Sequence, residues 1–172
     1  SFQNSIEVAY AFFKRHLESH GLVQNPDMDI HVDVPGWLPK YDGPSAGVAL
    51  ACSMISAFTG KTIPKNVTMT GEISMHGKVM PVGGIKEKVE ATYGKGIDKI
   101  FIPKENKWDY LDMLLKDTTH EMESVEASQE EVGKNLPVVI AVDRIEQIVE
   151  NLGIGIDESM IPKESTQEEP EK

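Results

Sequence analysis

Apolar residues along this chain repeat at two spacings, and the alternation between them predicts helices and strands. In helix-like segments the apolar residues lie three or four positions apart, on one helix face. These segments are residues 5–20, 45–58, 85–93, 108–116 and 144–152. Strand-like segments, with alternating or continuous apolar residues, are 29–34, 67–74, 79–82, 99–102 and 137–142. Helices that alternate with strands predict a domain of the α/β (α+β) class.

Glycine, proline and charge mark the breaks between these segments. Residues 35–44 hold three prolines and two glycines, which predicts a loop. A turn at 76–78 separates two strand-like segments, so 67–82 is expected to form a β-hairpin. Residues 117–135 are polar and acidic with little apolar periodicity, and we expect a surface excursion there.

The domain limits follow from the two ends of the pattern. The helical pattern begins almost at once, near Ser5, which is typical of a fragment cut from a longer polypeptide. Beyond residue 157 the chain is polar and rich in glutamate, so it cannot bury enough apolar surface to fold. We expect an ordered domain at 1–157 and an acidic, disordered tail at 158–172.

Charge and composition narrow the classes of function. The formal net charge of −11 repels phosphate backbones and anionic lipids, so neither nucleic acid nor a membrane is an expected partner. No apolar run approaches the roughly 20 residues of a membrane span. Cys52 is the only cysteine, which excludes an intrachain disulfide and is compatible with a reducing compartment. Its place on an apolar helix stripe predicts a core residue rather than a nucleophile.

Two local patterns resemble known sites but lack an essential residue. His16 and His20 have the spacing of a zinc-protease helix, but Glu18 does not directly follow the first histidine. We therefore expect a solvated helix face there. Residues 71–78 resemble a phosphate-binding loop, but the two glycines are one residue too far apart, and Val79 stands where a hydroxyl must hold Mg²⁺. No nucleotide site is predicted in this chain.

The strongest chemical candidate is Ser45, within the sequence Asp-Gly-Pro-Ser-Ala-Gly at 42–47. A nucleophilic serine needs an exposed hydroxyl, nearby N–H donors for an oxyanion and little steric obstruction. The start of a helix between small residues supplies all three. Serine is also a preferred helix N-cap, however, and on local spacing alone a capping role is favoured.

The sequence offers a general base for Ser45 only if a lysine can act as one. Lysine accepts a proton only when it is neutral, which requires lowering its pKa from about 10.4 to near 7. Lys86 follows Gly83 and Gly84 at the start of a predicted helix, where the helix dipole disfavours a cation. An anonymous lysine is nevertheless exposed in most proteins, so spacing alone does not pair it with Ser45.

Four blocks, in order along the chain, resemble the proteolytic domain of Lon-type ATP-dependent proteases. The resemblance covers about residues 5–152, and the blocks are 42–47, 69–73, 79–88 and 102–107. It implies the Lon proteolytic-domain fold, a mixed sheet with helices packed on it, here without its first strands. It also implies a serine endopeptidase that degrades unfolded, damaged or tagged proteins through an acyl-enzyme.

The resemblance assigns roles to individual residues. Ser45 is the implied nucleophile and Lys86 its general base. Thr70 matches a position whose hydroxyl bonds the catalytic lysine, and Asp42 matches a position that gates or orders the site. Trp37, Tyr41 and Gly84 are expected to line the substrate groove. The segment before Ser45 departs from the family, because Asp33 replaces the second of two histidines and the loop at 35–40 differs.

The same resemblance predicts partners and surroundings. Polypeptides are the expected substrates, and a homo-hexamer is expected in the full-length enzyme. No cofactor is expected in this chain, whereas ATP and Mg²⁺ belong to an upstream ATPase module. The expected compartment is the cytoplasm, with the mitochondrial matrix as the alternative. Two other readings stay open: a non-catalytic assembly domain of the same fold, and a Ser–Lys hydrolase of the signal-peptidase type.

Overall fold

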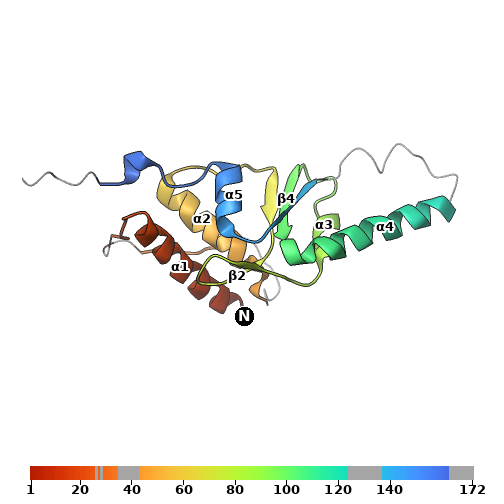
Figure 1. The fold of residues 1–172 in the computed structure, drawn as a ribbon, viewed down its shortest axis with the longest axis horizontal. Helices are drawn as coiled ribbons and strands as arrows, with labels where there is room; N and C mark the ends of the chain where they lie inside the picture. Colours follow the sequence, from red (N-terminus) through yellow and green to blue (C-terminus); the bar gives the residue numbers. More distant parts are fainter. Residues whose placement is uncertain (26, 28, 35–42, 124–136, 163–172) are drawn as a thin grey trace, which may run out of the picture.

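The fold is built from five α-helices, three short 3-10 helices and two small sheets in the part of the chain that the structure describes (Figure 1). This computed structural model describes residues 1–25, 27, 29–34, 43–123 and 137–162. The α-helices are α1 (Phe2–Ser19), α2 (Gly47–Thr59), α3 (Ile85–Glu90), α4 (Lys107–Glu123) and α5 (Ile145–Leu152). The strands are β1 (Val67–Met69), β2 (Glu72–Ile73), β3 (Val79–Met80), β4 (Lys99–Pro103) and β5 (Val138–Val142). The 3-10 helices are η1 (Pro44–Ala46), η2 (Lys104–Asn106) and η3 (Glu158–Met160).

The larger sheet is parallel, with β4 between β1 and β5. Its register places Phe101 opposite Met69 on one side and Ile140 on the other. A central parallel strand is covered on both faces, which explains the continuous apolar run of β4. Strands β2 and β3 form a separate antiparallel pair.

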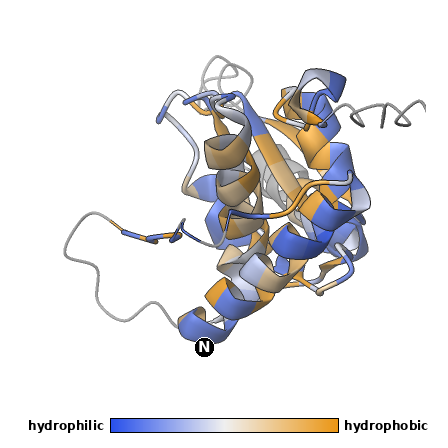
Figure 2. Cartoon of the chain, turned by 90° about the vertical axis from the view of Figure 1, so that its left-hand side faces the viewer, coloured by the Kyte–Doolittle hydropathy of each residue, from blue (hydrophilic) through white to orange (hydrophobic). Residues whose placement is uncertain are grey.

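Two apolar cores lie on opposite faces of the larger sheet. Phe101 belongs to the core shared with α1, α2 and α5, whereas Ile100 and Ile102 belong to the core under α3 and α4. Successive residues of a strand point to opposite faces, so a single strand supplies both cores. Figure 1 shows α1, α2 and α5 on one side of β4 with α3 and α4 on the other, and Figure 2 shows hydrophobic residues concentrated toward the middle of the domain.

The α/β class predicted from the sequence is confirmed, and most elements lie where the apolar spacing placed them. The predicted helices at 5–20, 45–58 and 144–152 correspond to α1, η1 with α2, and α5. The predicted strands at 99–102 and 137–142 correspond to β4 and β5. Helix α3 is shorter than expected because it ends at Glu90, three residues before the predicted limit of Tyr93.

Two strand predictions are wrong. Residues 29–34 adopt no regular structure, although Ile30 and Val32 pack against the core of α1 and α2. Their alternation therefore reflects packing without a hydrogen-bonded neighbour among the described residues. The predicted hairpin at 67–82 is also divided, because β1 joins the larger sheet and only β2 pairs with β3. The division falls at Thr70 and Gly71.

The predicted surface excursion begins inside a helix. Helix α4 runs to Glu123, well into the segment 117–135, and Figure 1 shows it extending away from the sheet. The rest of that segment, most of the loop at 35–44 and the last residues of the predicted tail lie outside the described residues. The short helix η3 lies at the start of the predicted tail. No described helix is both long enough and apolar enough to cross a bilayer.

Two helical side chains considered above as possible site residues, those of Cys52 and His16, are buried. Cys52 is fully buried in α2, as predicted, and burial raises the pKa of its thiol to about 12. His16 was expected on a solvated face, but it is only 8% exposed. Its ring packs between those of Phe12 and His20, at centroid distances of 5.6 and 4.7 Å. Burial lowers the pKa of His16, the charge of His20 lowers it further, and Glu146 opposes both effects.

The buried His16 predicts a loss of stability in mild acid. Because the pKa of His16 is lowered in the folded state, the unfolded chain binds this proton more readily. The stabilising contribution is present above the unfolded value of about 6.5 and is lost as the pH falls toward the folded value. The free energy of unfolding of His16→Gln should therefore fall less on acidification than that of the wild type. Urea unfolding at several pH values measures this, and His31→Gln, at an exposed position, should keep the wild-type dependence.

Candidate active site

Ser45 lies in η1, directly before α2, and is half-buried. Its carbonyl oxygen accepts the N–H of Gly71 at 3.0 Å and the hydroxyl of Thr70 at 3.5 Å. A second bond joins the same two segments, since the N–H of Val48 donates to the carbonyl of Gly71 at 3.1 Å. These bonds hold the start of α2 against the point where β1 ends and β2 begins.

Gly71 makes this approach possible because it has no side chain. A β-carbon at position 71 would lie 2.7 Å from Cγ2 of Val48 and 2.9 Å from Cγ1 of Val79. Both valines are fully buried, so neither can move aside easily. The predicted hairpin is therefore divided at the residue whose backbone binds the segment that carries Ser45.

Thr70 connects the serine to the centre of the sheet. It is buried, and its N–H donates to the carbonyl of Phe101 in β4 at 3.0 Å. Its hydroxyl faces the backbone of Ser45, whereas the resemblance predicted a bond to the lysine. The structure thus brings Thr70 and Ser45 together, and the role of Thr70 toward Lys86 stays a prediction.

Lys86 lies in the first turn of α3, where the sequence places it. The preceding Gly84 has φ 71° and ψ 34°, a left-handed conformation that glycine adopts without steric cost. The ammonium group of Lys86 is about half-exposed and forms an ion pair with Glu90 at 3.6 Å. Ser45 and Lys86 make no hydrogen bond to each other within the described part of the chain.

Three residues that contact Lys86 or the turn before it were not singled out from the sequence. Glu90 is its ion-pair partner, Lys88 donates its ammonium group to the carbonyl of Gly83 at 2.8 Å, and Asn106 binds the backbone of Val82. Burial lowers the pKa of Lys88, and the charge of Glu87 opposes this. The i,i+4 spacing on a predicted helix could have indicated Glu90 as a partner of Lys86, whereas no local spacing rule indicates the contacts of Lys88 and Asn106.

Other predicted site residues cannot be placed. Asp42, Trp37 and Tyr41 lie outside the described residues. Gly84, the remaining groove candidate, is exposed beside Lys86.

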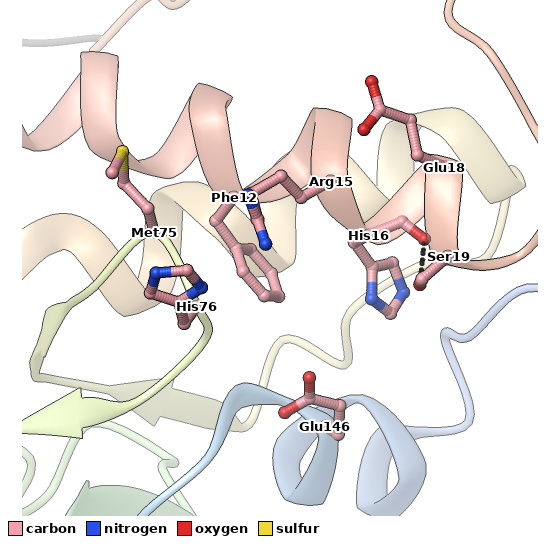
Figure 3. Close-up of a pocket in the computed structure, with 8 residues that line it drawn as sticks. All are labelled: Phe12, Arg15, His16, Glu18, Ser19, Met75, His76 and Glu146. Atoms are coloured by element: carbon pink, nitrogen blue, oxygen red, sulfur yellow. Dashed lines mark hydrogen bonds between the residues drawn. The ribbon is translucent and has the colours of Figure 1, made fainter.

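A cavity of about 380 Å³ lies elsewhere, between α1, the turn after β2 and α5 (Figure 3). Its lining includes Phe12, His16 and Ser19 of α1, Met75 and His76 of the turn, and Glu146 of α5. Neither Ser45 nor Lys86 lines this cavity. Nε2 of His16 is buried there without a hydrogen-bond partner. Among the described residues, no three His, Cys, Asp or Glu side chains are arranged to hold a metal ion.

Comparison with known proteins identifies the family. The family described as "Lon protease (S16) C-terminal proteolytic domain" matches residues 2–155. The Lon protease of Bacillus thuringiensis is 36% identical over 159 residues, which cover 90% of this chain and 18% of the relative. The Lon protease of Mycoplasma pneumoniae is 41% identical over 129 residues, with coverages of 73% and 16%. That of Escherichia coli is 43% identical over 111 residues, with coverages of 62% and 14%.

These relatives are much longer than the matched region. The chain spans less than a fifth of the length of each of the three. The match nevertheless includes every segment that holds Ser45, Thr70 and Lys86. This chain therefore belongs to the family of Lon protease C-terminal proteolytic domains.

Proposed function

We propose that this domain is a serine endopeptidase in which Ser45 attacks the peptide bond and Lys86 acts as its general base. The family match over residues 2–155 is the observation that carries this proposal, because it includes both residues in their blocks. The seat of Ser45 at the start of a helix supports it. Polypeptides are the proposed substrates. ATP-dependent unfolding by a separate module, assembly as a homo-hexamer and a cytoplasmic location are further parts of the proposal.

The proposed reaction begins with the transfer of a proton from the hydroxyl of Ser45 to a neutral Lys86. The serine oxygen then bonds to the peptide carbonyl carbon, and the carbonyl oxygen becomes an oxyanion. The amine product leaves with the proton from Lys86, which generates the acyl-enzyme. Water then hydrolyses the ester, with Lys86 again accepting and returning a proton.

The helix start supplies the groups that would stabilise the oxyanion. The N–H of Val48 is already donated to Gly71. The N–H groups of Ser45 and Ala46 precede it and are the proposed donors. Donors aimed at the developing charge are often the largest single contribution to catalysis. The positive end of the dipole of α2 adds to the same effect.

Lys86 must leave its ion pair with Glu90 to act as a base. This ion pair, at 3.6 Å, directs the amine of Lys86 toward the carboxylate of Glu90. Ion pairs between partly exposed side chains contribute little stability, so the long side chain of Lys86 can exchange partners. In the proposed mechanism, the arrangement with Lys86 bound to Glu90 is the resting state.

Covalent labelling tests this proposal directly. A fluorophosphonate reagent should modify this chain once, and peptide mass spectrometry should place the adduct on Ser45. Lys86→Met should slow the labelling strongly, because the hydroxyl loses its base. Ser53→Ala, which changes an exposed serine of α2, is the matched control and should leave labelling unchanged. An adduct on another residue, or labelling that survives in Lys86→Met, would contradict the proposal.

A further inference from the structure

The side chain of Asn106 holds the backbone of Val82 as a neighbouring strand would. Its Oδ1 accepts the N–H of Val82 at 2.9 Å, and its Nδ2 donates to the carbonyl of Val82, also at 2.9 Å. The same Nδ2 donates to Oδ2 of Asp109 at 2.7 Å. Asn106 is only 4% exposed. It lies in η2, directly after the central strand β4, so the clamp ties Val82 to the sheet.

A second side chain holds the next residue. The ammonium group of Lys88 donates to the carbonyl of Gly83, and the N–H of Lys88 donates to the carbonyl of Gly84 at 3.0 Å. The carbonyls of three successive residues, 82–84, are therefore occupied. These residues form the turn from which α3 and Lys86 start.

This turn has few other means of keeping its geometry. Gly83 and Gly84 are exposed and have no side chains to pack. Helix α3 has six residues and no side-chain hydrogen bond at its N-cap. Isolated helices of that length are not stable, so their direction depends on tertiary contacts. Ile85 and Val89 anchor one face of α3 in the core, and the clamp on residues 82–84 fixes its starting point.

We propose that Asn106 is a positioning residue for the Ser–Lys reaction, which fixes the turn at 82–84 so that Lys86 can reach Ser45. Lys88 is the second tether of the same turn. This inference rests on the proposed function. Asn106 touches neither reacting group and acts only through the backbone that carries Lys86.

The test compares kcat with KM for hydrolysis of an unstructured fluorogenic peptide by this chain. Asn106→Ala should lower kcat by on the order of 100-fold, because a misplacement of about 1 Å can have that effect. KM should change much less than kcat, since Gly84 is the only groove candidate in the displaced turn. Asn106→Asp keeps the acceptor for the N–H of Val82 but not the donor to its carbonyl, so an intermediate kcat is expected. Adding Asp109→Asn removes the new repulsion between carboxylates, and the remaining loss then reports on Val82.

Thr59→Val is the matched control for the loss of a buried polar group. The hydroxyl of Thr59 donates to the carbonyls of Ile55 and Ile154, both at 2.9 Å, at the far end of α2. This variant should lose stability but keep kcat. If Asn106→Ala behaves like Thr59→Val, with an unchanged kcat at a similar stability loss, the positioning role is overturned.

Lys88 gives an independent readout if Asn106→Ala does not fold. Lys88→Met removes the tether to Gly83 with little change in the core and should lower kcat by about tenfold. Lys88→Arg keeps a donor and should recover most of that loss. The inference is refuted by two results together. Lys88→Met and Lys88→Arg would both keep the kcat of the wild type, and Asn106→Asp would show no loss of kcat. Retained activity in Ser45→Ala would instead refute the proposed function, so the two failures are distinguishable.

Discussion

Replacing Ser45 by alanine or Lys86 by methionine should each lower kcat/KM for peptide hydrolysis by on the order of 10³-fold or more. The two residues perform one proton transfer, so neither contributes without the other. The double variant should therefore be no slower than either single variant. This non-additivity separates a dyad from two residues that contribute independently.

Glu90→Gln is the matched control for the lysine variant. It removes the ion-pair partner of Lys86 but keeps the amine, so activity should persist. The dyad is excluded if Lys86→Met retains full activity. A Glu90→Gln variant as inactive as Lys86→Met would instead show that Glu90 itself takes part in catalysis.

Gly71→Ala should destabilise the fold by about 1–3 kcal/mol, the usual range for overpacking a core, and should also abolish most of the peptidase activity. The added methyl group meets Val48 and Val79 at distances that real β-carbons do not show. Relief requires the segment between β1 and β2 to move away from both α2 and β3, which breaks the bonds that hold Ser45. Urea unfolding measures the first effect, and kcat measures the second.

Two further variants sharpen this test. Gly83→Ala adds the same methyl group where nothing lies within 4 Å and should leave stability nearly unchanged. Combining Gly71→Ala with Val48→Ala removes one of the two clashes. The combined loss of stability should be smaller than the sum of the single losses, as expected for residues that share one space. Strict additivity would show that the close approach at Gly71 is not what limits the packing.

The elements that could be predicted from the sequence are those whose apolar spacing directly reflects how they are buried. Helix α5 has an apolar stripe that repeats over its whole length, and β4 is apolar and buried from Ile100 to Pro103 because it lies at the centre of the sheet. The alternation of Ile30 and Val32 misled the prediction because packing without strand pairing produces the same pattern. Local sequence does not distinguish these two situations.

The site could be predicted only as far as the family resemblance extended. The resemblance named Ser45, Thr70 and Lys86, but the bond from Thr70 to Ser45 joins residues far apart in sequence, so no spacing rule reveals it. The division of the predicted hairpin has the same cause, since Gly71 is bound by α2 rather than by a strand. Asn106 lies in the last of the four family blocks, 102–107, but the resemblance assigned it no role, and its side chain is bonded like part of a sheet.

The segments that carry Ser45 and Lys86 are expected to differ in local stability. Thr70 ties the serine to β4, and the amide hydrogen of Thr70 should exchange with solvent only when the whole domain unfolds. Lys86 lies in a helix of six residues that follows two exposed glycines. Local opening of that helix should require far less free energy than unfolding of the whole domain. Any signal that switches the proposed activity on or off without unfolding the domain is therefore expected to act on the lysine side. Ligands that order residues 82–90 would raise the proposed activity, and those that loosen them would lower it.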